Sequence, residues 1–167
     1  IFDLDSFTKA FILATAWGSW HPLLNINSRY YFNPYTLKLE IITTDHEYGS
    51  LDKTWKFICK KTGAKYIQQS IQLPLISKED FINSFIKGLS SKTKVIFISH
   101  ITSPTALIFP VKEICKIAKE KGILSIVDGA HAPAQIKLDV QDINPDIYVG
   151  ACHKWMCSPK GVSFLYA

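Results

Sequence analysis

The chain has 167 residues, 47% of them apolar, which is enough for one domain with a sizeable core. Its formal net charge is +5, but the lysines are interspersed with Asp and Glu and form no basic arm, so we expect no nucleic-acid binding. No apolar run reaches the roughly 18–20 residues that cross a bilayer, and the first residues lack a basic signal-peptide region, so we expect no membrane segment.

The first 39 residues give a weaker pattern than the rest. Residues 7–17 have the apolar spacing of a helix, whereas residues 20–34 follow neither the helical nor the strand period. The chain starts without Met, and residues 162–166 are typical of a strand cut near its end. We therefore expect a fragment of a longer protein, with a divergent amino-terminal segment over 1–39 and the main domain over 40–167.

From residue 40 onward, apolar runs alternate with amphipathic segments, which is typical of a parallel sheet with crossover helices. Residues 95–99 are almost entirely β-branched or aromatic and predict a central strand that is buried on both faces. The predicted fold class is α/β, a three-layer α/β/α arrangement with a mostly parallel sheet. The predicted strands are 40–43, 95–99, 123–127, 147–149 and 162–166, and the predicted helices are 48–61, 77–89 and 110–121.

Polar residues follow four of these strands at the point where each strand ends. They lie at residues 43–48, 99–103, 128–131 and 153–154. In open α/β sheets, ligands bind beyond the carboxyl ends of the strands. We therefore expect the four clusters to meet in one crevice.

Asp128 and Lys154 carry the chemistry that the residues themselves suggest. Asp128 ends an apolar run, where an acid is either a turn or helix-capping residue or a carboxylate that faces a bound cation. Lys154 is either a surface lysine or, because its neighbours are mostly apolar, an amine nucleophile. Pyridoxal phosphate requires a carboxylate for its pyridine nitrogen and an amine for its aldehyde. At roughly 4 Å and an effective dielectric near 20, the carboxylate would stabilise a cationic ring by about 4 kcal/mol.

The histidines and cysteines leave alternatives open. His46, His131 and His153 are each either ligand-binding residues or half-buried structural histidines. Cys152, His153 and Cys157 offer a zinc alternative, but no second close cysteine pair completes four ligands, so we expect no metal site. The four cysteines do not suggest a secreted disulfide framework in a chain of this length, so we expect reduced thiols in a cytoplasmic protein.

Four motifs in the same order resemble the class V aminotransferase family of fold-type I pyridoxal phosphate enzymes. They are TTDHEYG at 43–49, SHITSPT at 99–105, VDGAHAP at 127–133 and GACHKW at 150–155. The branch that contains isopenicillin N epimerase-like proteins is the most similar, and cysteine desulfurases are close relatives. The resemblance implies a pyridoxal-phosphate-binding large domain over 40–167, with the small carboxy-terminal domain missing. It also implies an amino-acid substrate and, for the full-length protein, a homodimer.

The resemblance further implies roles for individual residues. Lys154 would bind the aldehyde of pyridoxal phosphate as a Schiff base and move the proton at the substrate's α-carbon. Asp128 would pair with the pyridine nitrogen, and His131 would bond the phenolic oxygen of the ring. The other cofactor-binding residues would be His46 stacked on the ring, with Tyr48 as the second candidate for that face, Ser103 or Thr102 at a cofactor oxygen, and His153 near the phosphate.

Two departures from the family pattern are relevant to function. Relatives have a phosphate loop of small residues, whereas residues 24–31 are bulky, with Asn25 and Ser28 as the remaining candidates. The expected truncation would remove the arginine that clamps the substrate carboxylate in relatives, and also the loop that carries the desulfurase cysteine. A cysteine desulfurase-like enzyme and a non-catalytic fragment therefore remain alternatives. A dinucleotide-binding oxidoreductase is disfavoured because no G-x-G-x-x-G motif follows a strand.

Overall fold

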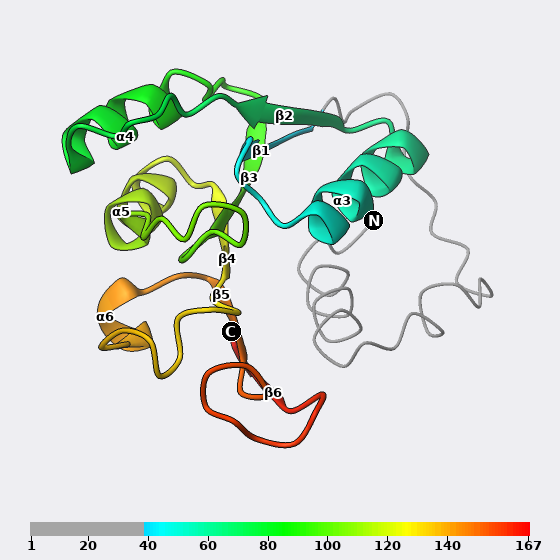
Figure 1. Cartoon of the computed structure of the whole chain (residues 1–167). Coiled ribbons are helices and arrows are strands. Elements are labelled where there is room, and N and C mark those ends of the chain that lie inside the picture. Colours follow the sequence, from blue (N-terminus) through cyan, green and yellow to red (C-terminus); the bar gives the residue numbers. More distant parts are fainter. Residues whose placement is uncertain (1–38) are drawn as a thin grey trace.

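The computed structural model describes residues 39–167, which form a six-stranded sheet with helices on both faces (Figure 1). The strand order is β2-β1-β3-β4-β5-β6, and every neighbouring pair is parallel except β5 and β6, which are antiparallel. The predicted α/β fold with a mostly parallel sheet is confirmed. The strands are β1 (Glu40–Thr44), β2 (Lys65–Gln69), β3 (Thr93–Ser99), β4 (Leu124–Asp128), β5 (Ile147–Ala151) and β6 (Ser163–Tyr166).

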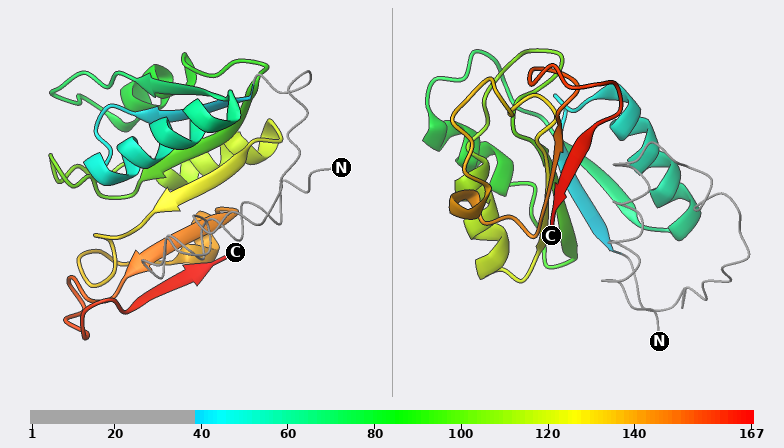
Figure 2. Two further views of the ribbon diagram at one scale, coloured as in Figure 1. Left: turned by 90° about the vertical axis from the view of Figure 1, so that its right-hand side faces the viewer. Right: turned by 90° about the horizontal axis from the view of Figure 1, so that it is seen from below.

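The helices lie in two layers, one on each side of the sheet (Figure 2). Helix α3 (Gly49–Thr62) covers one face, and α4 (Lys78–Ile86), α5 (Val111–Glu120) and the one-turn α6 (Val140–Ile143) cover the other. Local sequence features mark two of the helix ends. The Ser77 side chain accepts the Asp80 N–H at the start of α4, and Gly63 ends α3 with a left-handed φ of 75°.

Alternate residues of the strands face two separate cores. Ile96, Ile98 and their neighbours on β4 and β5 pack against α4, α5 and α6. Phe97 faces the opposite side, where its ring centroid lies 5.5 Å from that of Trp55 on α3. Because side chains alternate across a strand, burial on both faces requires the continuous apolar run that β3 has. The expectation of a doubly buried central strand is thereby confirmed.

Two short elements were not predicted from the sequence. Strand β2 pairs with the outer side of β1, and its five residues, KYIQQ, are all at least partly exposed. An edge strand needs neither an apolar run nor strict alternation, so its sequence carries little signal. Helix α6 has four residues and is too short for a helical period, although the Asp139 side chain caps it by accepting the Asp142 N–H.

The register of the sheet aligns the carboxyl ends of the central strands. Ser99 at the end of β3 is paired with Asp128 at the end of β4, which is paired in turn with Val149 on β5. The residues that follow these ends therefore start from one edge of the sheet. The predicted helix over 7–17 and the candidate phosphate loop over 24–31 lie outside the described residues. Within residues 39–167, no helix combines the length and the apolar character that a membrane span requires.

Candidate active site

A cleft of about 270 Å³ lies where the carboxyl ends of β3, β4 and β5 meet the first turn of α3. Polar residues from all four predicted strand-end clusters line it, so the expected crevice is present. The predicted site residues that line the cleft are Tyr48, Ser103, Asp128, His131, His153 and Lys154.

Asp128 is fixed at the cleft by backbone contacts on both sides. Its carbonyl accepts the His100 N–H at 2.8 Å, and the N–H of Gly129 donates to the Val149 carbonyl at 2.8 Å. The carboxylate oxygen Oδ1 accepts the Ala130 N–H at 2.9 Å. Burial raises the pKa of Asp128, while the Ala130 N–H and the charge of Lys154 act in the opposite direction. A cation beside this carboxylate would offset the cost of burying its charge.

Lys154 reaches the same cleft from the turn between β5 and β6. Its Nζ lies 2.9 Å from Nε2 of His131 and 5.9 Å from the centroid of the Tyr48 ring. The turn is closed by backbone contacts, including the Cys157 N–H, which donates to the Lys154 carbonyl at 3.3 Å. The amine is therefore held within a small set of aromatic and imidazole groups.

His131 contacts two residues of this turn. Its Nε2 faces Lys154, and its Nδ1 accepts the indole N–H of Trp155 at 3.1 Å. Burial lowers the pKa of His131, the charge of Lys154 lowers it further, and Asp128 opposes both. The lowered pKa favours the neutral ring, which has one donor and one acceptor nitrogen.

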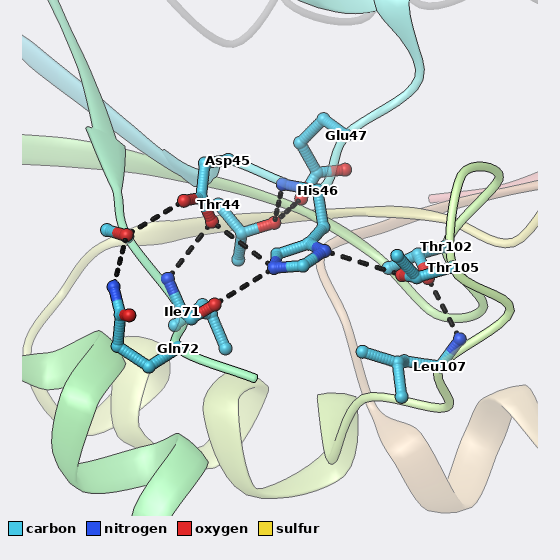
Figure 3. A network of polar contacts seen from close by, with 10 residues as sticks. Thr44, Asp45, His46, Glu47, Ile71, Gln72, Thr102, Thr105 and Leu107 are labelled. Carbon is cyan, nitrogen blue, oxygen red and sulfur yellow. Dashed lines mark hydrogen bonds and ion pairs between the residues drawn. The ribbon is translucent and has the colours of Figure 1, made fainter. Parts of the chain in front are cut away.

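His46 and Thr102 lie apart from the cleft, in a polar network between the β1 loop and the 102–107 loop (Figure 3). Nε2 of His46 lies 3.0 Å from the Ile71 carbonyl, and the ring packs edge-on against Phe109. Thr102 is buried, and its hydroxyl oxygen accepts the Leu107 N–H at 2.9 Å. Both side chains stabilise loops, whereas Tyr48 and Ser103, the alternative candidates, line the cleft.

His153 lines the cleft at its β6 side. Its Nδ1 lies 3.0 Å from the Val162 carbonyl, so Nδ1 carries the hydrogen, because a carbonyl can only accept. Among residues 39–167, no group of three or more His, Cys, Asp or Glu side chains is arranged to hold a metal ion.

Sequence reasoning missed Glu47, a buried carboxyl next to the cleft. Glu47 Oε2 accepts both the N–H and the hydroxyl of Ser99, and Oε1 accepts the Thr44 hydroxyl at 2.7 Å. Burial raises the pKa of Glu47 to about 7, and the nearby Asp128 charge adds to the rise. The only sequence signal was an acid inside a strand-end cluster, which does not distinguish a buried carboxyl from an exposed one.

In a comparison with known protein families, the family model described as Aminotransferase class-V matches residues 24–167. The chain belongs to the class-V aminotransferase family. This class-V aminotransferase chain is 34% identical over 129 residues to isopenicillin N epimerase of Streptomyces clavuligerus, a match that covers 76% of the chain and 32% of that relative. It is 32% identical over 126 residues to L-cysteine desulfhydrase of Arabidopsis thaliana, covering 71% and 28%. A probable cysteine desulfurase of Synechocystis sp. is 37% identical over 130 residues, covering 76% and 29%.

Solved structures show the same fold. The cystine C-S lyase C-DES, solved with its reaction product cysteine persulfide, superposes with a TM-score of 0.68 at 26% identity, over 78% of this chain and 35% of that one. The apo cysteine desulfurase of Thermococcus onnurineus superposes with a TM-score of 0.66 at 26% identity, over 77% and 31%. The chain thus spans about a third of the length of the proteins it matches.

Proposed function

We propose that this class-V aminotransferase domain binds pyridoxal 5'-phosphate in the cleft and takes part in a reaction at the α-carbon of an amino acid. Family membership supports the cofactor, because class-V aminotransferases are pyridoxal phosphate enzymes. The observation that carries the proposal is the convergence of an amine, an imidazole and a buried carboxylate: Lys154 Nζ lies 2.9 Å from His131, and Asp128 lines the same cleft.

The residues present fit this cofactor on chemical grounds. Asp128 is a carboxylate whose burial is unfavourable unless a cation faces it, and a protonated pyridine nitrogen is such a cation. Tyr48 offers an aromatic face near Lys154, which suits a planar ring. His153 and Ser103 line the cleft and are the described residues that would contact the phosphate or another cofactor oxygen. We assign the stacking role to Tyr48 and not to His46, because His46 is bound to the Ile71 carbonyl outside the cleft.

The roles of the chain's own groups follow from this placement. Pyridoxal phosphate, when bound, supplies an electron sink for the charge that develops at the substrate's α-carbon. Asp128 would favour the protonated ring nitrogen, which would strengthen that sink. Lys154 would bind the cofactor's aldehyde carbon, and its amine would be the base that removes and returns the α-proton of the substrate. His131, which contacts Lys154, would help to hold the cofactor ring in place.

The relatives suggest which reactions to test. One relative is named isopenicillin N epimerase, and others are named L-cysteine desulfhydrase or cysteine desulfurase. We propose epimerase-like chemistry on an amino acid as the first candidate and carbon–sulfur cleavage of cysteine as the second, favoured by the superposition on a cystine C-S lyase. We further propose a homodimeric cytoplasmic protein, and the free state of Cys59, Cys115, Cys152 and Cys157 supports a reducing compartment.

Reductive trapping tests the proposal directly. The protein is incubated with pyridoxal phosphate and reduced with borohydride, and the modified lysine is then located by peptide mass spectrometry. The expected result is modification of Lys154, lost in Lys154→Ala and retained in Lys160→Ala, which changes an exposed lysine of the same loop. If the total lysine modification were the same in wild type and Lys154→Ala, with other lysines carrying it, the proposal would be overturned. Exchange of the α-hydrogen in D2O, compared with sulfide release from cysteine, then separates the two reactions.

A further inference from the structure

The indole of Trp155 makes a contact that the proposed reaction does not use. Trp155 follows Lys154 in the turn after β5, and about half of its surface is exposed. Its Nε1–H donates to Nδ1 of His131 at 3.1 Å, with the two ring planes inclined by 55°. An indole nitrogen is a donor only, so this hydrogen bond has one possible direction.

That direction determines which nitrogen of His131 carries the hydrogen. A neutral imidazole has one N–H and one lone pair, and the indole uses the lone pair of Nδ1. The hydrogen must then be on Nε2, the nitrogen that lies 2.9 Å from Lys154 Nζ. The Gln135 side chain donates to the His131 carbonyl at 2.8 Å, which anchors the backbone of the loop.

The position of Nε2 indicates what it would contact when pyridoxal phosphate is bound. The cofactor carries its phenolic oxygen on the ring carbon next to the one that bears the aldehyde. A group that lies 2.9 Å from the amine that would hold the aldehyde carbon is therefore close enough to contact that oxygen, the contact that the resemblance implies for His131. A phenolate oxygen accepts hydrogen bonds and is destabilised by a facing lone pair, so only the Nε2–H form of His131 suits it.

We propose that Trp155 is a positioning residue that fixes the Nε2–H tautomer of His131, so that the imidazole presents a hydrogen-bond donor to the phenolic oxygen of the cofactor. This inference rests on the proposed function for the identity of the acceptor. Trp155 does not line the cleft, so it would act through His131.

Lys154 competes with Trp155 for the imidazole when no cofactor is attached. An ammonium has three donors and no acceptor, so it would donate to Nε2 and require the hydrogen on Nδ1, where the indole already donates. A neutral ring cannot accept both bonds. The other ionisable groups at the cleft are Asp128 at the end of β4, Tyr48 before α3 and His153 beside Lys154. A clean measurement of the Trp155 effect therefore needs a background without the amine.

The first test measures the protonation midpoint of His131 in the absence of cofactor. It uses nitrogen-15 NMR titration of the histidines in Lys154→Met and in Lys154→Met/Trp155→Phe. Phenylalanine keeps an aromatic ring but has no N–H. Because the indole bond favours the neutral ring, its loss is expected to raise the protonation midpoint of His131 by about half to one pH unit, the effect of one ordinary hydrogen bond. Met156→Leu, a change at the next exposed residue of the turn, should leave the midpoint unchanged.

The second test measures the visible absorption band of the lysine-bound cofactor as a function of pH in Trp155→Phe. A hydrogen bond from His131 to the phenolate favours the deprotonated form of the lysine-bound cofactor. Loss of the indole N–H is expected to weaken that hydrogen bond and so to raise the proton affinity of the bound cofactor about tenfold, a shift of one pH unit. Met156→Leu should again leave the titration unchanged. An unchanged His131 midpoint overturns the inference about Trp155 whether or not cofactor attaches, and an unchanged band titration overturns its link to the cofactor. Failure of the wild-type protein to attach pyridoxal phosphate overturns the proposed function instead.

Discussion

Glu47 gives the sharpest stability prediction, because it is a buried acid whose pKa is far from its ordinary value. Its side chain is 7% exposed and is held by the Ser99 N–H at 3.0 Å and the Thr44 hydroxyl at 2.7 Å. Burial raises its pKa from 4.5 to about 7. Between these two pH values the folded chain keeps a proton that the unfolded chain has lost, so the free energy of unfolding falls as pH rises.

The size of the fall follows from the two pKa values. The difference between 4.5 and about 7, at 1.36 kcal/mol for each pH unit, is about 3 kcal/mol. Below pH 4.5 Glu47 is protonated in both states, and above about pH 7 it is ionised in both states. The loss is therefore complete near pH 8, and stability does not fall further from this group.

Glu47→Gln should remove this dependence. Glutamine has the same size and is always neutral; its amide oxygen can accept the Ser99 N–H, and its amide nitrogen can donate to the Thr44 hydroxyl. We expect the variant to match wild type below pH 4.5 and to be more stable by about 3 kcal/mol at pH 8, measured by urea unfolding in the absence of pyridoxal phosphate. Asp128, whose pKa is also raised, is present in both proteins, so the difference between them reports Glu47 together with its interaction with Asp128.

The control is Glu120→Gln, a change at an exposed acid at the end of α5, which should leave the pH dependence of wild type unaltered. Equal slopes of unfolding free energy against pH in wild type and Glu47→Gln would refute the reasoning, because they would mean that Glu47 is ionised in the folded chain well below pH 7.

Three further changes test the packing and the ligand roles at the cleft. Gly129→Ala would place a methyl group on the buried Tyr148 ring, and we expect a loss of roughly 1–3 kcal/mol or more in urea unfolding, with cofactor binding lost in parallel. Asp128→Asn keeps an acceptor for the backbone but not the charge; absorption spectra should still show lysine-bound cofactor, whereas turnover of amino acids should fall strongly, and unchanged turnover would contradict the assigned role. Tyr48→Ala should weaken pyridoxal phosphate binding about 2- to 10-fold in a fluorescence titration, as expected for one aromatic contact, while His46→Ala should lower stability and leave affinity unchanged.

The fold was largely predictable because its central elements carry strong patterns. The apolar run of β3 predicts a strand and the apolar spacing of α4 predicts a helix, and the structure contains both. Strand β2 was not predictable, since its pairing with β1 supplies the stability that its polar sequence does not indicate. Contacts between distant residues decide such elements, and a single sequence does not show them.

The same limit explains which site residues the sequence could identify. Asp128 was a candidate because it directly follows the predicted strand 123–127, and Lys154 was one because it lies among mostly apolar residues shortly after the predicted strand 147–149. His46 and Tyr48 are two residues apart, and the choice between them depends on the Ile71 carbonyl, which binds His46 from 25 positions away. The contact between His131 and Trp155 spans 24 positions and depends on the shape of two loops.

Asp128 and Lys154, on two sides of the candidate site, are held in place by different kinds of contact. Asp128 is fixed by the register of three strands, because its carbonyl is bound by the residue after β3 and the next N–H is bound to β5. Lys154 and Trp155 instead belong to a turn closed by its own hydrogen bonds, where the Cys152 N–H donates to the Val162 carbonyl at 3.0 Å. A change in the turn can therefore move the amine and retune His131 without disturbing the carboxylate. A change in the sheet displaces Asp128 only by breaking strand pairs, which costs stability as well as binding.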